Sequence, residues 1–177
     1  MRAMIYSGGS DLDDLRLEER PAPPPPAAGE VSVRVHASSL NYHDYLVVRG
    51  QLGVAAGRIP LADAGGVVTA VGAGVRELGV GDAVVSCFFP EWQAGLPPGG
   101  DFSRTPGDGI DGFARETVTA PVNAFTRAPR GWSHAEAATI TTAGVTAWRA
   151  LVVNGRLKAG DSVLLLGTGG VSIYALQ

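Results

Sequence analysis

The C-terminal stretch of the chain carries glycines at a spacing that suits the binding of a phosphate group. Residues 162–172 read SVLLLGTGGVS, an apolar run followed by a glycine turn, and residues 171–177 have the composition of a helix start. A buried strand, a glycine turn and a helix N-terminus in this order predict the first βα unit of a dinucleotide-binding fold. Gly167 would permit the turn, Gly169 would let the backbone approach a pyrophosphate, and Ser172 takes the place of the third glycine. The alternative is a glycine-rich connection in an unrelated domain.

This predicted βα unit is incomplete. A parallel sheet needs a neighbouring strand that arrives through its own crossover, and residues 161–177 offer a single strand and a short helix. We therefore expect the chain to be the N-terminal portion of a longer enzyme, with negligible turnover by itself. The unpaired apolar edge of the strand would pair readily with another chain, so we expect a homodimer.

Short strands separated by glycine and proline make up most of the remaining chain. In residues 30–36, Val31, Val33 and Val35 fall on one face and polar residues fall on the other, which is typical of a half-buried strand. Several such strands with glycine turns predict a small barrel or sandwich. The expected strands lie within residues 2–6, 15–20, 30–36, 60–73, 79–89, 112–121 and 124–128.

Two stretches of the sequence have helical character. Residues 41–49 could form a short helix that Gly50 ends. Ser133 and Glu136 have the spacing of a capping box, and they open a mostly apolar segment that runs to about residue 153. The threonine and glycine content of this segment favours two helices broken near Gly144 over one continuous helix.

Residues 89–111 have no periodicity and contain Trp92, Phe102 and several glycines and prolines. A loop of this length inside a compact domain is usually functional or mobile. We expect it to line the rim of a substrate cleft and to be mobile without a ligand, and a surface insertion without a role is the alternative.

Composition restricts the class of protein. The net charge of −3 and the pI near 5.5 argue against a nucleic acid or an anionic membrane as the partner. The single cysteine, Cys87, excludes an internal disulfide and a four-cysteine zinc site, and its apolar surroundings predict a small core residue. The chain has no signal-peptide pattern and no apolar run of membrane-spanning length, so we expect a cytoplasmic protein.

Five stretches occur in an order that resembles the medium-chain dehydrogenase/reductase superfamily. They read GEVSVRVHASSLNYHD, PLADAGGVVTAVGAGV, VGDAVV, EAATITTAGVTAWRAL and GDSVLLLGTGGVS, and they most resemble the zinc-free branches that are alcohol dehydrogenase-like or quinone oxidoreductase-like. The resemblance implies a mainly β fold with an α/β start. Residues 1–130 would be a GroES-like barrel forming the catalytic domain, and residues 131–177 would be bridging helices and the incomplete start of an NAD(P)-binding Rossmann domain.

The resemblance also implies which residues face the reacting groups. Asn41, His43 and Asp44 would lie beside the nicotinamide and the substrate, with His43 as a candidate proton donor because its ordinary pKa lies near neutrality. Asp44 would orient His43, or pair with Arg49 while His43 is merely a solvated helix residue. The implied cofactor-binding residues are Asn41, Thr142, Thr146, Gly167, Gly169, Gly170, Val171 and Ser172.

Zinc-dependent members of the superfamily place three metal ligands at positions that resemble Asn41, Ala62 and Thr139 of this chain. None of these three is a good zinc ligand, so we expect no zinc. The sequence thus predicts a zinc-independent oxidoreductase that uses NADP or NAD, with NADP slightly favoured, on a small carbonyl, quinone, enone or alcohol. The alternative is a non-catalytic binding or structural module with a GroES-like fold.

Overall fold

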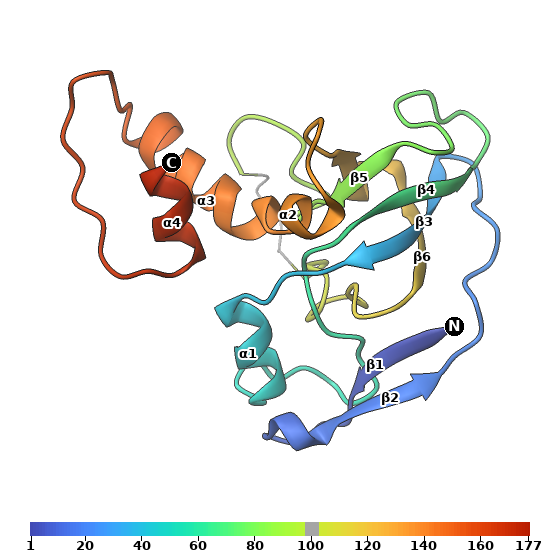
Figure 1. The fold of residues 1–177 in the computed structure, drawn as a ribbon. Helices are drawn as coiled ribbons and strands as arrows, with labels where there is room; N and C mark the ends of the chain where they lie inside the picture. The colour runs from blue at the N-terminus through green and yellow to red at the C-terminus, as the bar shows by residue number, and fades with distance from the viewer. Residues whose placement is uncertain (98–102) are drawn as a thin grey trace.

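The computed structural model describes residues 1–97 and 103–177, and among them a β-rich body carries a helical arm at the C-terminal end (Figure 1). The strands are β1 (Arg2–Tyr6), β2 (Leu15–Glu19), β3 (Glu30–Ala37), β4 (Gly65–Val71), β5 (Ala83–Ser86), β6 (Thr117–Pro121) and β7 (Phe125–Arg127). The helices are α1 (Tyr42–Val48), α2 (His134–Ala138), α3 (Val145–Trp148) and α4 (Gly170–Leu176). Short 3₁₀ turns at Leu12–Asp14 and Val122–Ala124 and π-helical turns at Ile140–Gly144 and Arg149–Asn154 complete these elements.

Five antiparallel strands form one curled sheet in the order β6-β3-β4-β5-β7. The two edge strands, β6 and β7, are joined by only the three residues Val122–Ala124. The backbone from Pro121 to Phe125 can span at most about 14 Å. A flat sheet of this width would place its edges about 19 Å apart, so the sheet must curl as it does in a barrel.

The core lies inside this curl, and the alternation in β3 explains how it is filled. Val31 and Val33 are fully buried, which confirms the predicted inward face. Ser32 is also buried, because its hydroxyl shares a 2.8 Å hydrogen bond with Thr119 of β6. The buried apolar cluster comprises Val31, Val33, Ala64, Val68, Leu78, Val84, Phe113, Val118, Ala124 and Phe125.

A two-stranded ribbon of β1 and β2 lies beside the sheet (Figure 1). Ala3 pairs with Arg115, and the Met4 amide donates to the Ala114 carbonyl at 2.8 Å. The segment before β6 therefore fastens the ribbon to the sheet. The expected strands 2–6 and 15–20 are confirmed, and the strands expected within 79–89 and 112–121 are shorter than those ranges.

The capping box at the start of α2 is confirmed, but the break predicted near Gly144 is wrong. The Ser133 amide donates to Glu136 Oε2 at 2.8 Å, and the Glu136 amide donates back to Ser133 Oγ at 3.3 Å. Gly144 has ordinary right-handed helical angles, φ −67° and ψ −46°. The backbone accommodates its glycine and threonines by widening into π-helical turns instead of breaking, a feature often found at functional sites.

The predicted strand at residues 162–166 is also wrong, whereas the helix after the glycine turn forms as α4. Residues 162–166 are irregular, and the side chains of Leu164 and Leu166 are 85% and 81% exposed. The physical reason is that a strand exists only as part of a ladder, and the described residues provide no neighbouring strand for this segment.

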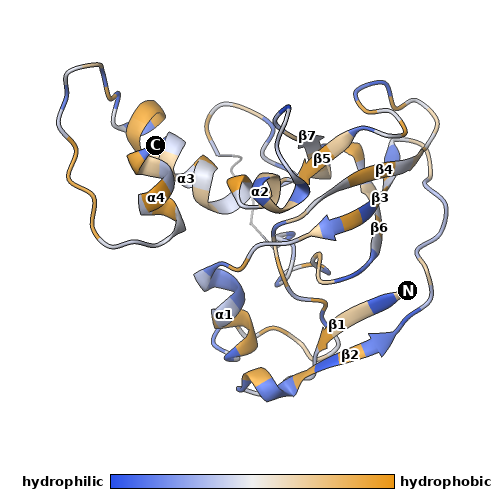
Figure 2. Cartoon of the chain, in the orientation of Figure 1, coloured by the Kyte–Doolittle hydropathy of each residue, from blue (hydrophilic) through white to orange (hydrophobic). Residues whose placement is uncertain are grey.

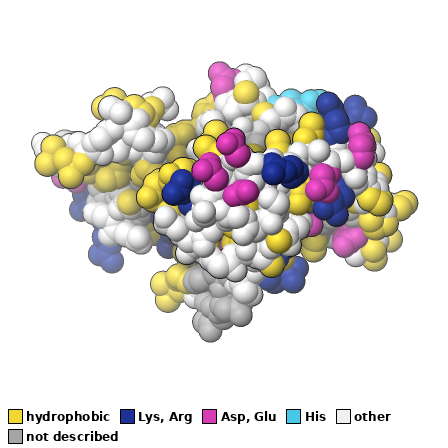
Figure 3. All heavy atoms as spheres, turned by 90° about the horizontal axis from the view of Figure 1, so that it is seen from below, with side chains coloured by type: hydrophobic (Ala, Val, Ile, Leu, Met, Phe, Trp, Pro, Cys, Tyr) yellow, Lys and Arg dark blue, Asp and Glu magenta, His cyan; other side chains and the backbone are white. Residues whose placement is uncertain are grey.

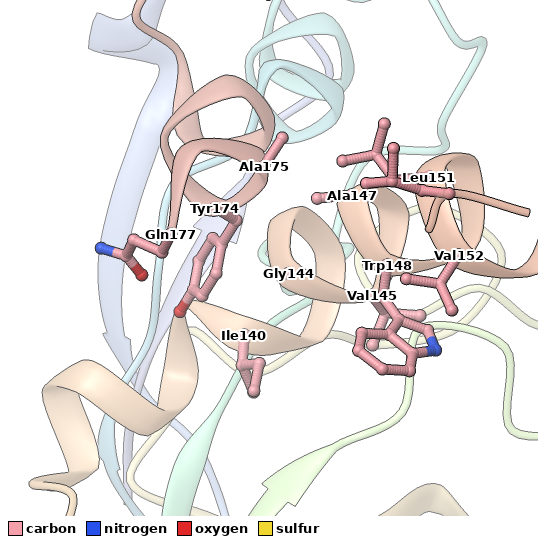
Figure 4. Close-up of a pocket in the computed structure, with 11 residues that line it drawn as sticks. Ile140, Gly144, Val145, Ala147, Trp148, Leu151, Val152, Tyr174, Ala175 and Gln177 are labelled. Atoms are coloured by element: carbon pink, nitrogen blue, oxygen red, sulfur yellow. The ribbon is translucent and has the colours of Figure 1, made fainter. Parts of the chain in front are cut away.

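An apolar groove of about 440 Å³ lies between α4 and the helical segment before it. Figure 4 shows Tyr174 of α4 beside Gly144 and Ile140, and the Tyr174 hydroxyl lies 2.6 Å from Thr139 Oγ1. On the other side of Gly144 the groove is lined by Trp148, which is 63% exposed. The C-terminal arm is rich in hydrophobic residues (Figure 2), and several of them are exposed at the surface (Figure 3). Among the described helices, none is both long and apolar enough to span a membrane.

Candidate functional site

A cavity of about 560 Å³, the turn cavity, lies between the start of α1 and the glycine turn before α4. It brings together side chains from three distant parts of the sequence. From the predicted site residues, those that line it are Asn41, His43, Thr142, Gly169, Gly170, Val171 and Ser172. Asp44 is buried directly behind His43. Most of the predicted site residues therefore converge on one space.

Two predicted cofactor residues do not line the turn cavity. Thr146 is exposed on α3, one helical turn beyond Thr142, and it is not among the residues that line this space. Gly167 lies before the lining residues Gly169 and Gly170, and its φ of +77° gives the left-handed turn that the sequence predicted. Gly167 thus shapes the turn, while the later glycines form the wall.

Asp44 fixes the entrance to α1. Its Oδ2 accepts a 2.8 Å hydrogen bond from the Asn41 amide, and its Oδ1 accepts a 3.1 Å bond from the Ala62 amide. The side chain is almost fully buried. Arg49 instead lies over the ring of Tyr45, 6.0 Å from its centroid. Asp44 therefore caps the helix and orients its neighbours, and the alternative of an Asp44–Arg49 ion pair is not what the structure contains.

Asp63 organises the polar wall of the turn cavity from behind. It is fully buried between the Ala62 and Ala64 backbones. Its Oδ2 accepts hydrogen bonds from Ser39 Oγ at 2.6 Å and from Asn41 Nδ2 at 2.9 Å. Its Oδ1 accepts a 2.6 Å bond from Thr142 Oγ1. One carboxylate thus sets the orientation of three groups that face the cavity.

The pKa of Asp63 is raised above its ordinary value, chiefly by burial. The three hydrogen bonds from Ser39, Thr142 and Asn41 oppose that shift, and the nearby charge of Asp44 adds to it. All three partners donate to Asp63, so the carboxylate acts purely as an acceptor, which is the role of its ionised form.

His43 lies between two carboxylates. Its Nε2 is 2.9 Å from Asp108 Oδ2, and its Nδ1 is 3.7 Å from Asp44 Oδ1. The neighbouring Asp44 carboxylate raises the pKa of His43, burial opposes the shift, and Asp108 adds to the rise. The edge of the imidazole meets the ring of Phe88, with centroids 5.3 Å apart. His43 is therefore a held side chain and not the solvated residue of the alternative interpretation.

A second cavity of about 450 Å³, the aromatic cavity, lies on the other side of Thr142, which lines both spaces. Phe88, Phe89 and Trp92 line it. The Arg149 guanidinium stacks over the Trp92 ring at 4.3 Å from the centroid. Part of the 89–111 loop thus borders a cavity. Its role at a substrate cleft and its mobility stay predictions, and Phe102 lies outside the described residues.

Cys87 follows β5 and lines the aromatic cavity, so the prediction of a simple core residue is wrong. Burial raises the pKa of its thiol, which keeps the thiol protonated and poorly nucleophilic. The strand expected within residues 79–89 ends at Ser86, so Cys87 lies just beyond β5.

Sequence reasoning did not identify Asp63 and Asp108 as parts of the site. A charged residue within the apolar stretch PLADAGG is a usable signal for Asp63, because an acidic side chain is rarely buried without partners. Asp108 gave no comparable signal. It lies in an aperiodic loop, and only the path of that loop brings it to His43.

The sequence and the fold match known proteins. Residues 27–130 match the family model of the alcohol dehydrogenase GroES-like domain. The chain belongs to this family. It is therefore a member of the medium-chain dehydrogenase/reductase superfamily, which confirms the resemblance found in the sequence.

Three relatives illustrate the match of this GroES-like chain. A zinc-type alcohol dehydrogenase-like protein of Schizosaccharomyces pombe is 36% identical over 185 residues, which cover 100% of this chain and 52% of that protein. The crystal structure of an NAD-dependent alcohol dehydrogenase has a TM-score of 0.86 at 30% identity, covering 99% of this chain and 54% of that one. A quinone oxidoreductase from Coxiella burnetii has a TM-score of 0.79 at 27% identity, covering 99% and 51%. The chain spans about half the length of each of them.

The residues at the family's zinc positions do not fit a catalytic zinc ion. The Asn41 amide donates to Asp63, Ala62 has no side-chain donor atom, and the Thr139 hydroxyl bonds with Tyr174. Within residues 1–97 and 103–177, no three His, Cys, Asp or Glu side chains gather as a metal-binding group. A catalytic zinc needs three such protein ligands, so the chemistry of this wall is that of a hydrogen-bonding site.

Proposed function

We propose that the natural protein containing this chain is an NAD(P)(H)-dependent oxidoreductase that acts without zinc on a small carbonyl, quinone, enone or alcohol. Residues 1–130 would form its catalytic domain, and residues 131–177 would begin its cofactor-binding domain. The family and the oxidoreductases among its relatives support the general class. The Asn41 and Thr142 side chains on the wall of the turn cavity already donate hydrogen bonds to Asp63, which supports a mechanism without metal.

The convergence of Asn41, His43 and Thr142 opposite the glycine turn at 169–172 is the observation that carries this proposal. A glycine wall lets a phosphate approach the backbone closely, and the side chains across the cavity can orient a polar ring. The nicotinamide, when bound, would supply or accept the hydride. In the reducing direction, His43 would supply the proton to the substrate oxygen, and Asn41 and Thr142 would hold the reacting groups in place. The alcohol direction reverses the proton transfer.

Cofactor binding and turnover test this function directly. NADPH and NADH would be titrated by fluorescence or calorimetry into residues 1–177 and into the product of the natural reading frame that contains them. We expect the natural product to bind a nicotinamide cofactor, with NADPH favoured slightly, and to reduce a quinone or an enone. We expect residues 1–177 alone to show negligible turnover, because the 167–172 turn offers only part of a dinucleotide site.

The same samples test the association of the chain. The exposed Leu164 and Leu166 favour pairing of the 161–177 segment with a second copy, so sedimentation of residues 1–177 should show a dimer. Cofactor-dependent turnover by residues 1–177 would contradict the first expectation, and a monodisperse monomer would contradict the second. Absence of nicotinamide binding by the natural product would overturn the proposed function.

We predict that the purified natural protein carries no tightly held zinc. Asn41, Ala62 and Thr139 stand where the superfamily has ligands, and two of them are already engaged in hydrogen bonds within the protein. Elemental analysis of the purified protein before dialysis against a chelator should give substoichiometric zinc, and activity should be the same before and after the dialysis. Stoichiometric zinc whose removal abolishes turnover would refute this prediction.

A further inference from the structure

The two carboxylates that flank His43 reach it from different parts of the chain. Asp44 is the next residue on α1, and Asp108 belongs to the loop that leads toward β6. Asp44 is fixed by the Asn41 and Ala62 amides, and the other oxygen of Asp108 accepts the amide hydrogen of Gly109. Both carboxylates are therefore set in place by backbone groups and not only by the imidazole.

This geometry restricts the protonation state of the imidazole. A neutral ring carries one N–H, and the 2.9 Å contact between Nε2 and Asp108 Oδ2 places that hydrogen on Nε2. The lone pair of Nδ1 would then face Asp44 Oδ1 at 3.7 Å, and Nδ1 is buried without any hydrogen-bond partner. A second proton on Nδ1 replaces a repulsive contact between two acceptors with an attractive one. The pocket thus fits the imidazolium better than the neutral ring.

We propose that Asp108 is a positioning residue that acts through His43: together with Asp44 it holds the imidazole as a cation and fixes its plane against the wall of the turn cavity. Its effect on turnover rests on the proposed function, in which His43 supplies a proton. Among residues 1–97 and 103–177, the charged groups that face the ring are Asp44 on its own helix and Asp108 on the loop. Phe88, which meets the ring edge from beyond β5, is uncharged and helps to exclude water.

Asp108 brings the 103–111 part of the loop into contact with the start of α1. His43 and Asp108 are 65 residues apart in sequence, yet their side chains are 21% and 26% exposed and share a direct contact. A contact in this partly shielded setting is screened less than one on the open surface, so it influences proton affinity more strongly. A substrate oxygen that took its proton from Nε2 would compete with Asp108 Oδ2 for that proton.

The test is a ¹H–¹⁵N NMR titration of the His43 ring in residues 1–177. The chain has three histidines, so the signals can be assigned with His43→Gln. We expect His43 in the wild type to titrate above an ordinary histidine. Asp108→Asn should lower its midpoint by about one pH unit, a tenfold loss of proton affinity. Asp108→Glu should restore part of the shift, because it returns the charge.

Asp111→Asn is the matched control. Asp111 lies in the same loop but accepts from the Ile59 amide and pairs with Arg58, and an asparagine can still accept that amide bond. In Asp111→Asn, the midpoint of the His43 titration should equal that of the wild type. An unchanged midpoint in Asp108→Asn, or an equal fall in Asp111→Asn, would overturn the role of Asp108. The NMR titration needs no cofactor and no turnover. Its outcome can therefore be distinguished from a failure of the proposed oxidoreductase function.

Discussion

Replacing Asp63 with alanine is expected to destabilise the chain by about 1–3 kcal/mol for each hydrogen-bond donor that loses its acceptor. Three donors, Ser39 Oγ, Asn41 Nδ2 and Thr142 Oγ1, now point at the buried carboxylate. Alanine leaves them around a small space without an acceptor. The loss would be measured by urea denaturation, as a lower midpoint with an unchanged dependence on denaturant.

Asp63→Asn is the matched variant because it keeps the shape and removes only the charge. Its amide oxygen can accept the bonds from Ser39 and Asn41, and the Thr142 hydroxyl can turn to accept from the amide NH₂. We therefore expect Asp63→Asn to remain within about 1 kcal/mol of the wild type. If the alanine and asparagine variants were equally stable, the buried hydrogen bonds would not be what Asp63 contributes.

The same pair of variants predicts a pH dependence. Burial raises the pKa of Asp63 in the folded chain above its value in the unfolded chain. Ionisation of this group therefore costs stability, and the cost grows as the pH rises from the unfolded pKa through the folded pKa. The stability of the wild type relative to Asp63→Asn should fall across that acidic window and level off above it. A difference that stays constant with pH would contradict the raised pKa.

The parts of the fold that sequence reasoning recovered are those set by local pattern. The alternation in β3 places Val31 and Val33 in the core, and the Ser133 cap starts α2 where it was expected. The strand at 162–166 was predicted wrongly. An apolar run shows that a segment could be buried in a sheet, but it does not show whether a neighbouring strand is present to pair with it. Local composition also could not distinguish a broken helix at Gly144 from a widened one.

Some residues of the candidate site could likewise be predicted from the sequence, and others could not. Asn41 and His43 lie in one short motif, and family resemblance placed them beside the cavity that they do line. Asp63 and Asp108 act through contacts across 22 and 65 residues of sequence. Contacts of that range depend on how β4 and the 103–111 loop are placed, and no periodicity in the chain encodes them. The supporting carboxylates therefore became visible only with the fold.

His43→Gln is expected to lower the turnover of the natural protein by about 100- to 10,000-fold, the usual effect of losing a positioned proton donor. Glutamine keeps much of the size and polarity of histidine but cannot supply a proton at neutral pH. Because the proton is needed in the reducing transition state, kcat should fall far more than KM changes. The measurement is steady-state reduction of a quinone or an enone with saturating NADPH.

The pH profile separates this role from a structural one. Asp44 and Asp108 raise the pKa of His43, so activity that depends on the imidazolium should persist at neutral pH and be lost as the pH rises through the folded pKa. The raised pKa also means that the flanking carboxylates stabilise the folded chain through the His43 imidazolium. This stabilisation is fully present below the pKa of His43 in the unfolded chain and is lost above its pKa in the folded chain. His36→Gln is the matched control, because His36 stacks on His134 at 4.7 Å and does not line the turn cavity. If His43→Gln kept the wild-type rate and the same loss of activity at high pH, the proton would have to come from another group.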